Sequence, residues 1–537
     1  MSAAPPPLDQ AQVRATLLAL LTGGQPETAV DTVLQFLTAL QDHATALAQR
    51  VAQLLKQTYG RRSEQVDPAQ LRLLLAALAG APTESPAAAA TAPTLPAPPP
   101  RAPRRPPTGR RPLPADLPRE EQVHTPPERE RHCAGCDQPK ARIGVERSEV
   151  LEWLPATFKV IVHLREKYAC PRCQDGVVIA PVPEKVIDGG RPGPGLLAHV
   201  LVAKYRDHVP LYRLAGIYAR SGVALAPSTL GGWVAEGAEL LTPVADAIYA
   251  TVLDAHVLQI DDTGLRVLDR SHPGGVKKGH LWGLVGDGRL VAFAYTPSWE
   301  GAAARALVET RRGWLHADGY AGFDQLFTRP GATAVEVGCW AHTRRKFFEA
   351  MEAGDVRAAL AVERIQQLYR LERDATVRGL DAAARLALRQ AQATPIVDAL
   401  GQWIADVHPQ APPRSLLGKA LRYALNQWTA LRRFLEDGAL PLDTNGVERA
   451  LRAIAVGRKN WLFAGADVGA RRAAILYTLF GSCALCGVEP WAYARDVLEK
   501  VSGTTFPQSR LPELLPDRWG TDHPEARIAA APPIRAP

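Results

Sequence analysis

Two Cys-x-x-Cys pairs constrain the fold of this chain more tightly than any other feature. The four cysteines are Cys133, Cys136, Cys170 and Cys173. Each pair sets two thiolates on one tight turn, and two such turns complete a tetrahedral zinc site. The apolar segments 150–154 and 158–163 suit the strands of a zinc ribbon. A redox dithiol needs only one pair, so we expect one structural Zn²⁺ with no open coordination position.

A chain of 537 residues is too long for one compact core. Near its N-terminus, apolar residues follow alternating four- and three-residue steps, which indicates an a/d helical seam. They are Val33, Leu37, Leu40, Ala44, Leu47, Val51 and Leu54. The seam fits a short coiled coil or a helix packed on its own domain. Residues 81–131 are rich in alanine and proline and read as a linker.

The basic charge balance favours a polyanionic partner. The formal net charge is +8, and arginine, which binds phosphate oxygens as a fork, supplies most of the excess. Within the linker a cluster of arginines reads either as a solvated tether or as an arm that follows DNA phosphates, and we favour the arm. The cluster consists of Arg101, Arg104, Arg105, Arg110 and Arg111.

Residues 181–255 have helical composition. We expect helices over 196–205, 211–221 and 228–240, with Gly222 separating the last two. Two helices joined by a short turn suit a helix-turn-helix that binds DNA. The same pattern also occurs in helical proteins that bind no DNA.

From His256 the pattern changes to strands. The segments 256–260, 279–285 and 289–295 predict three antiparallel strands, followed by a helix over 301–311. Short strands ending at Asp318 and at Val337 come next, and a helix over 340–351 closes the series. Three antiparallel strands followed by helix-linked strands is the order of an RNase H-like fold, so we expect a multidomain α+β protein with an RNase H-like α/β core.

Acidic residues occupy the places where such a core would hold metal. Asp261 and Asp262 directly follow the first strand, and Asp318 ends a later one. Glu448 follows an N-cap-like start at residues 443–445, in the first turns of a late helix. Carboxylate oxygens are the ligands that Mg²⁺ prefers. Strand parity cannot choose between Asp261 and Asp262.

The chain resembles transposases of the bacterial insertion-sequence family numbered sixty-six, the TnpC type, over nearly its whole length. Besides both cysteine pairs, the segments that carry the resemblance are Gly60–Glu64, Leu113–Arg119, Asp207–Arg213, Asp261–Thr263, His316–Gly322, Cys339–Phe347, Asn445–Ala450, Gly457–Phe463 and Tyr493–Leu498. The resemblance implies a DDE triad of Asp261, Asp318 and Glu448 that binds two Mg²⁺ (or Mn²⁺) ions per active site. It also implies a helical insertion between the second and third acids, and residues 353–434 have helical composition.

The expected organisation has eight segments. They are 1–80, helical; 81–131, linker; 132–180, zinc ribbon; 181–255, helix-turn-helix-like; 256–352, first part of the core; 353–440, helical insertion; 441–507, last part of the core; and 508–537, a disordered tail.

Basic residues near the acids are candidates for contacts with transposon-end phosphates. For Arg458, Lys459 and Asn460 the alternative is a helix terminus that satisfies its own dipole, and for Arg344 and Arg345 a solvated helix face. Cys339 and His342 have the spacing of half a metal site, but a buried cysteine with a hydrogen-bonded histidine explains them equally simply.

The sequence and the resemblance together predict a transposase that binds terminal repeats and cuts and joins double-stranded DNA. A non-catalytic DNA-binding protein, decayed or repurposed, is the alternative, and a nuclease acting on hybrids or junctions is a third reading. We expect a homo-oligomer, with small accessory proteins as further partners. No apolar run long enough to span a membrane and no secretory signal is apparent, so we expect a cytoplasmic, nucleoid-associated protein.

Overall fold

In the computed structural model, residues 192–503 and 506–528 are described, together with residues 158, 167–168, 178–179 and 185–187 and isolated positions between 15 and 35. The chain divides into two compact units, one formed by residues 84–164 and the other by the remaining residues. The described positions between 15 and 35 are almost all helical. Of the predicted N-terminal seam, only Val33 lies within the described residues.

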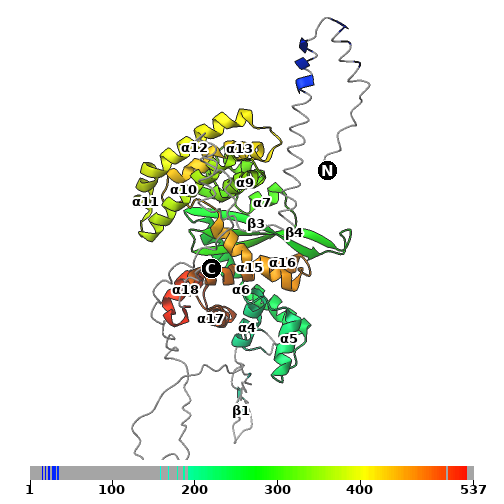
Figure 1. Ribbon diagram of the computed structural model, residues 1–537. Helices are drawn as coiled ribbons and strands as arrows, with labels where there is room; N and C mark the ends of the chain where they lie inside the picture. Colours follow the sequence, from blue (N-terminus) through cyan, green and yellow to red (C-terminus); the bar gives the residue numbers. More distant parts are fainter. Residues whose placement is uncertain are drawn as a thin grey trace, which may run out of the picture. The chain divides into compact units, whose positions relative to one another are not determined.

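A mixed five-stranded sheet lies at the centre of the larger unit (Figure 1). Its strands are β3 (Val257–Leu268), β4 (Val276–Gly286), β5 (Leu290–Thr296), β6 (Gly313–Ala317) and β7 (Ala334–Gly338). The order across the sheet is β5-β4-β3-β6-β7. The strands β3, β4 and β5 are antiparallel, whereas β6 and β7 run parallel to β3. The predicted series of three antiparallel strands followed by helix-linked strands is therefore confirmed.

Helices far apart in sequence gather on one side of this sheet. They are α4 (Pro194–Tyr205), α5 (Leu211–Arg220), α6 (Pro227–Leu253), α15 (Asn445–Trp461), α16 (Asp467–Cys486) and α17 (Pro490–Ser502). Among them, α6 and α16 pack on β5, and α15 packs on β3. The helix predicted over 228–240 continues through Pro243 to Leu253, because Val244, Ile248 and Val252 are buried in the same core as the sheet. Residues 194–253 thus share the core of the sheet.

The residues between β7 and α15 form only helices. They are α9 (Trp340–Glu352), α10 (Ala358–Val377), α11 (Ala382–Leu388), the π-helical turn η3 (Arg389–Ala393), α12 (Thr394–Val407), the turn η4 (His408–Gln410), α13 (Leu416–Asn426), α14 (Trp428–Arg432) and the turn η5 (Arg433–Leu435). They build a second hydrophobic core around Trp340, Phe347 and Leu421. Figure 1 shows these helices on the side of the sheet opposite to α6 and α16. The first and last residues of this helical region are close together: the N–H of Trp340, which begins α9, donates to Leu442 O, shortly before α15, at 3.0 Å.

The C-terminal tail corrects one expectation. Residues 508–528, predicted to be disordered, contain the turn η6 (Gln508–Leu514), the helix α18 (Pro516–Asp522) and the turn η7 (Pro524–Ala526). Trp519 is buried and packs edge-on against Tyr493 of α17, with ring centroids 5.3 Å apart. Val488 and Arg527 form a β-bridge. Apolar residues in a proline-rich segment therefore order it, because the core of the protein offers them a place to pack.

Two short helices follow β5. They are α7 (Gly301–Ala306) and α8 (Asp324–Thr328), separated by β6 and the turn η2 (Ala321–Phe323). The helix predicted over 301–311 ends at Ala306, because Leu307 and Val308 donate to carbonyls three residues back and tighten the chain into a turn.

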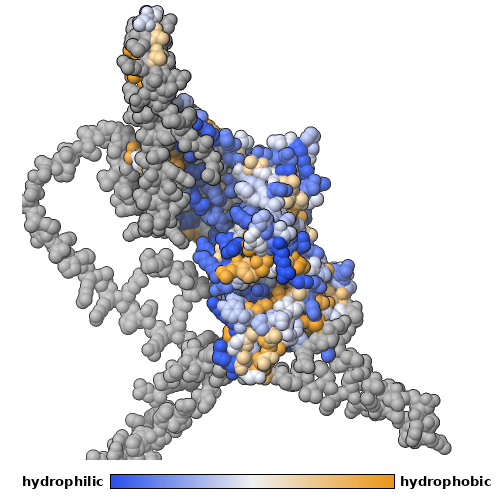
Figure 2. Space-filling view, turned by 90° about the vertical axis from the view of Figure 1, so that its right-hand side faces the viewer, coloured by the Kyte–Doolittle hydropathy of each residue, from blue (hydrophilic) through white to orange (hydrophobic). Residues whose placement is uncertain are grey.

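The described surface is mainly hydrophilic in Figure 2, with apolar patches toward its lower part. Exposed apolar side chains include Tyr212 and Ile217 on α5, and Leu462 and Phe463 between α15 and α16. Within the residues described, no helix is long and apolar enough to cross a membrane.

Candidate active site

Three acidic side chains come from three different elements and meet at one end of the sheet. Asp261 lies within β3, Asp318 directly follows β6, and Glu448 occupies the first turn of α15. The parallel register of β3 and β6 pairs Gln259 with His316. Two residues further along each strand, this register sets Asp261 level with Asp318. The fold therefore brings together the three acids predicted from the sequence.

The electrostatics of Asp261 reflect this crowding. Burial raises the pKa of Asp261 to about 7, and the negative charges of Asp318, Asp262 and Glu448 push it in the same direction. The backbone N–H of Asp262, which donates to Asp261 Oδ1 at 2.8 Å, opposes the rise. A carboxyl group perturbed by like charges in a partly buried site is typical of functional sites.

The neighbouring Asp262 has different partners. One of its carboxylate oxygens, Oδ2, pairs with His280 Nδ1 at 2.5 Å, and the other accepts from Trp299 Nε1 at 3.1 Å. His280 lies on the adjacent strand β4. Asp262 is therefore engaged by a histidine and a tryptophan, whereas burial and the charges of Asp318 and Glu448 act on Asp261.

Side chains of β3 and α15 hold this strand and helix together. Gln259 of β3 donates through Nε2 to Asp443 O and accepts the Val447 N–H at Oε1, each at 3.1 Å. Arg458, three turns beyond Glu448, donates through Nη1 to Thr263 Oγ1 at 2.8 Å and to Gly264 O at 2.6 Å. Both ends of α15 are therefore anchored to the strand that carries Asp261.

The helical insertion contributes side chains that approach Glu448. His342 in α9 approaches Glu448, with Nε2 3.9 Å from Oε1, while its Nδ1 contacts Cys339 Sγ at 3.3 Å. Burial lowers the pKa of His342, although the charges of Asp318 and Glu448 act in the opposite direction. Cys339 Sγ also accepts from Thr444 N and Oγ1, both at 3.4 Å. Of the two readings of Cys339 and His342, the structure shows the buried cysteine with a hydrogen-bonded histidine.

The three carboxylates suit a divalent cation in type. Glu448 Oε1 is buried and has no hydrogen-bond partner. An unpaired buried carboxylate oxygen beside two further carboxylates suits a hard cation, which prefers such oxygens. In the described part of the chain, no three acidic, histidine or cysteine side chains already stand in a metal-binding arrangement. The three acids are therefore of the right residue type for a cation and lie near one another, but they do not surround a single position.

The predicted phosphate-binding residues near the acids occupy different environments. Lys459 is exposed and Asn460 is half-buried on α15, whereas Arg458 is bonded to β3. On α9, Arg344 lies over the Phe348 ring, 5.6 Å from its centroid. The exposed Arg345 acts electrostatically on His342, which places its charge close to the acids.

The other predicted binding residues lie outside the described residues. These are Arg101, Arg104, Arg105, Arg110 and Arg111 of the linker, and the zinc ligands Cys133, Cys136, Cys170 and Cys173. Around the second cysteine pair, the strands β1 (Lys167–Tyr168) and β2 (Val178–Ile179) form an antiparallel ladder. Of the strands expected between the two pairs, only Phe158 is described, and it belongs to no strand.

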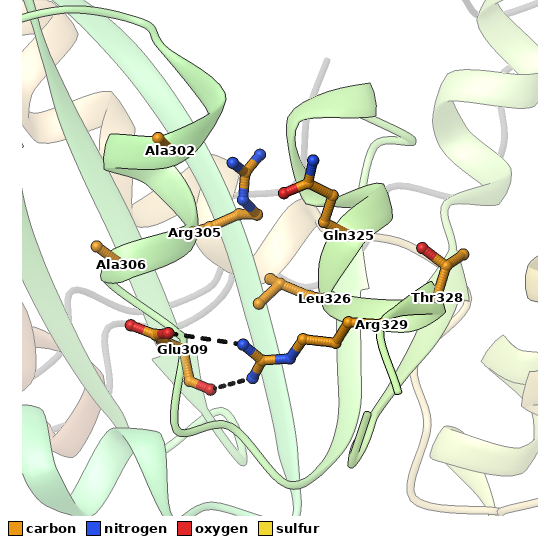
Figure 3. A pocket seen from close by; sticks show the side chains of 8 residues that line it. All are labelled: Ala302, Arg305, Ala306, Glu309, Gln325, Leu326, Thr328 and Arg329. Atoms are coloured by element: carbon orange, nitrogen blue, oxygen red, sulfur yellow. Dashed lines mark hydrogen bonds and ion pairs between the residues drawn. The ribbon is translucent and has the colours of Figure 1, made fainter. Parts of the chain in front are cut away.

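A pocket of about 360 Å³ lies between α7 and α8 (Figure 3). None of the three acids lines it. In Figure 3, Arg329 is paired with Glu309 and Arg305 extends toward Gln325. Arg305 Nη1 also donates to Gly322 O at 2.9 Å. Two arginines and one glutamate line this pocket, and none of the three candidate metal ligands does.

Sequence reasoning missed several residues that shape the site. Gln259 is a polar residue inside an apolar strand, and that was a readable signal. Tyr423, whose hydroxyl donates to Asp318 O at 2.5 Å, comes from α13 of the insertion, and only the fold reveals this contact. The same is true of Trp299, which contacts Asp262 from the loop after β5.

Comparison with known proteins gives a consistent result along the chain. The profile described as "Transposase IS66 family" matches residues 189–472. The profile "Transposase C of IS166 homeodomain" matches residues 46–121, and "zinc-finger binding domain of transposase IS66" matches residues 130–174. The "IS66 C-terminal element" matches residues 478–516.

Similar proteins occur in Sinorhizobium fredii (strain NBRC 101917 / NGR234). The uncharacterized protein y4hP is 34% identical over 503 residues, which covers 88% of this chain and 88% of that protein. The uncharacterized protein y4jD is 33% identical and covers 76% of this chain and 82% of its own length. A third, y4qI, is 36% identical and covers 78% of each chain.

Proposed function

Because this chain belongs to the IS66 transposase family, we propose that it is a DDE-type transposase that cleaves and joins DNA at the ends of an insertion sequence. The observation that carries the proposal is the approach of Asp318 and Glu448 to Asp261, whose pKa their charges raise together with burial. Three carboxylates, one within a strand, one at a strand end and one on a late helix, form the donor set that phosphoryl transfer with divalent metals requires.

In this proposal Asp261, Asp318 and Glu448 would hold two Mg²⁺ (or Mn²⁺) ions. When bound, the ions would activate the attacking oxygen and stabilise the leaving oxygen of the scissile phosphate. The carboxyl of Asp261 must be ionised to act as a ligand, so its proton leaves before the site is competent. Water is the nucleophile for cleavage, and the freed 3′-hydroxyl is the nucleophile for joining, so no covalent protein–DNA intermediate is formed.

The surrounding residues position the three acids. Gln259 and Arg458 fix the position of α15 along β3, and thereby the distance between Asp261 and Glu448. His342 limits where the Glu448 carboxylate can turn, and Tyr423 fixes the backbone at Asp318. Such positioning matters because catalysis by metal-bound carboxylates depends on geometry.

Several finer features belong to the same proposal. The sheet order with three antiparallel strands followed by two parallel strands supports an RNase H-like core. Four thiolates in the segment that matches a zinc-finger profile support one structural Zn²⁺. Terminal-repeat DNA is bound by this segment and the helices of residues 181–255. The protein assembles as a homo-oligomer on paired ends in the nucleoid, with small accessory proteins of the element.

The experiment uses the full-length protein and flanking DNA that contains the native ends of the element, with Mg²⁺. We expect 3′-end nicking and strand joining by the wild type and their loss in Asp318→Asn. Asp324→Asn is the matched control, because Asp324 is an exposed acid of α8 six positions along the chain. Specific end binding without cleavage in the wild type, even with accessory proteins added, would favour the non-catalytic alternative.

A further inference from the structure

Trp299 is an exposed aromatic side chain at the edge of the candidate active site. It lies in the loop between β5 and α7, and 53% of its surface is exposed. Large aromatic side chains with a hydrogen-bonding group are usually more buried than this. Its Nε1–H donates to Asp262 Oδ1 at 3.1 Å, which fixes the indole beside the strand that carries Asp261.

A second aromatic ring supports Trp299. Tyr320 stacks on it with ring centroids 4.7 Å apart and an interplanar angle of 26°. The Tyr320 hydroxyl donates to Trp299 O at 2.7 Å, so the two residues are joined at the ring and at the backbone. Beneath them, Trp282 and Phe323 contact Tyr320 at centroid distances of 6.0 Å and 5.4 Å. The exposed indole therefore rests on a rigid aromatic base.

This aromatic pair is connected to the acids on both sides. Trp299 bonds Asp262, the neighbour of Asp261, and the Tyr320 N–H donates to Asp318 Oδ1 at 3.1 Å. Trp299 thus contacts the residue next to Asp261, and Tyr320 contacts Asp318 itself. Two hydrogen bonds and a ring stack fix its position relative to the place where the scissile phosphate would lie.

A positive charge lies near the pair. Arg305 of α7 acts electrostatically on Tyr320 and donates to Gly322 O at 2.9 Å. In Figure 3 its side chain lines the pocket between α7 and α8. An aromatic surface near an arginine is a combination that binds unpaired nucleotides, because bases stack on rings while cations follow the phosphates.

We propose that Trp299, supported by Tyr320, is a stacking platform for one unpaired base of the DNA end, next to the scissile phosphate. The inference rests on the proposed transposase function and adds a specific contact to it. Unpairing a base costs free energy, and stacking of that base on an aromatic side chain offsets this cost. The platform would hold the strand in the extended path that brings its phosphate to the carboxylates.

The test measures binding of the full-length protein without Mg²⁺ to two sets of duplexes carrying the native end. One set is fully paired, and the other has a single mismatched base, moved one position at a time around the cleavage point. The wild type should bind one mismatched duplex at least fivefold more tightly than the paired one. Stacking on one aromatic side chain corresponds to roughly five- to hundredfold in affinity.

The variants separate ring stacking from a structural role. Trp299→Ala should lose the preference for the mismatched duplex, whereas Trp299→Phe should keep most of it, although it loses the Nε1 bond to Asp262. Trp491→Ala is the matched control, because Trp491 is also partly exposed but lies on α17. It should keep the full preference. Melting curves of each variant check that the fold is intact.

The results also separate this inference from the proposed function. A wild type that cleaves DNA but binds both duplexes equally would overturn the platform and leave the transposase proposal standing. A Trp299-dependent preference without cleavage would support the platform and count against catalysis. Equal loss in Trp299→Ala and Trp299→Phe would assign the effect to the Asp262 bond and overturn stacking. Binding to neither duplex would overturn both ideas.

Discussion

Gln259 accepts the Val447 N–H at 3.1 Å and so links the middle of the sheet to the first turn of a helix that begins 186 residues later along the chain (445 − 259). Its side chain is 7% exposed, and its amide also donates to Asp443 O. One side chain therefore satisfies two backbone groups at the start of α15. The Asp443 carbonyl lies just before the helix, and the Val447 N–H belongs to the residue directly before Glu448. The relative position of the first and third acids depends on this amide.

Replacing Gln259 with methionine should weaken both the fold and the site. The substitution keeps the approximate volume but leaves the Val447 N–H and the Asp443 carbonyl without partners, which costs about 1–3 kcal/mol for each buried group. We expect a lower urea midpoint and reduced strand cleavage. Gln402→Met on the exposed face of α12 is the control, with an expected change below about 0.5 kcal/mol. Equal midpoints for the two variants would refute the bridging role.

Stability should depend on pH through Asp261. Its folded pKa of about 7 lies above the ordinary value of 3.8, so the folded protein binds more protons than the unfolded chain between these values. The contribution of Asp261 is therefore most favourable below pH 4 and is lost as the pH rises to 7. The stability of Asp261→Asn relative to wild type should increase by up to about 4 kcal/mol over this range. Urea unfolding of both proteins at several pH values measures the difference.

Divalent metal supplies the control for that titration. Mg²⁺ binds ionised carboxylates, so it should raise the melting temperature of the wild type more at pH 8 than at pH 5. Asp261→Asn should show a smaller shift at pH 8. A shift in the variant as large as that in the wild type would mean that the metal binds elsewhere.

Arg458 and Lys459 should have separable roles. Arg458 holds β3 through Thr263 and Gly264, so Arg458→Lys should lower the free energy of unfolding by about 1–3 kcal/mol. Lys459 is exposed, so Lys459→Gln should leave stability unchanged. If Lys459 contacts a phosphate, the slope of log affinity against log salt should fall by about one. Binding titrations at several salt concentrations decide whether it does.

The buried Arg389 should be essential for the helical insertion. Its guanidinium pairs with Glu372 at 2.7 Å and donates to the carbonyls of Phe434, Asp437 and Leu440. Burial alone would raise the pKa of Glu372, but hydrogen bonds and charge from Arg389 hold it below its ordinary value. Arg389→Met should cost about 3–5 kcal/mol, because it leaves Glu372 with Arg385 alone, 2.9 Å away, and removes the donor from three backbone carbonyls.

The control for Arg389 is an exposed pair in the same insertion. Arg378 contacts Asp374 at 3.3 Å with both side chains more than half exposed, so Arg378→Met should cost less than about 1 kcal/mol. Hydrogen exchange over residues 358–435 should accelerate only in Arg389→Met. Uniform acceleration across the sheet as well would show that the insertion does not unfold separately.

The sequence was informative where local pattern decides structure. Apolar strands bounded by glycine located β4, β5 and β6, and Asp318 was found because it ends such a strand before a glycine. The length of α6 was not foreseen, because its burial outweighs the break that Pro243 suggests. Asp261 and Asp262 could not be distinguished by parity. Their separate environments depend on His280 and on Trp299, which lies 37 residues beyond Asp262. Contacts of this kind are fixed only by the fold.

The hydrogen bond between Trp340 and Leu442 has a consequence for how such proteins can diverge. The chain leaves the sheet and returns to it at one point, so helices can be lengthened or deleted between these residues without displacing Glu448. Tyr369 and Tyr423 limit this freedom, because they reach Asp443 and Asp318 from α10 and α13. Among relatives, length variation should therefore concentrate in α11, α12 and the turn at residues 378–381, while α10 and α13 keep their register.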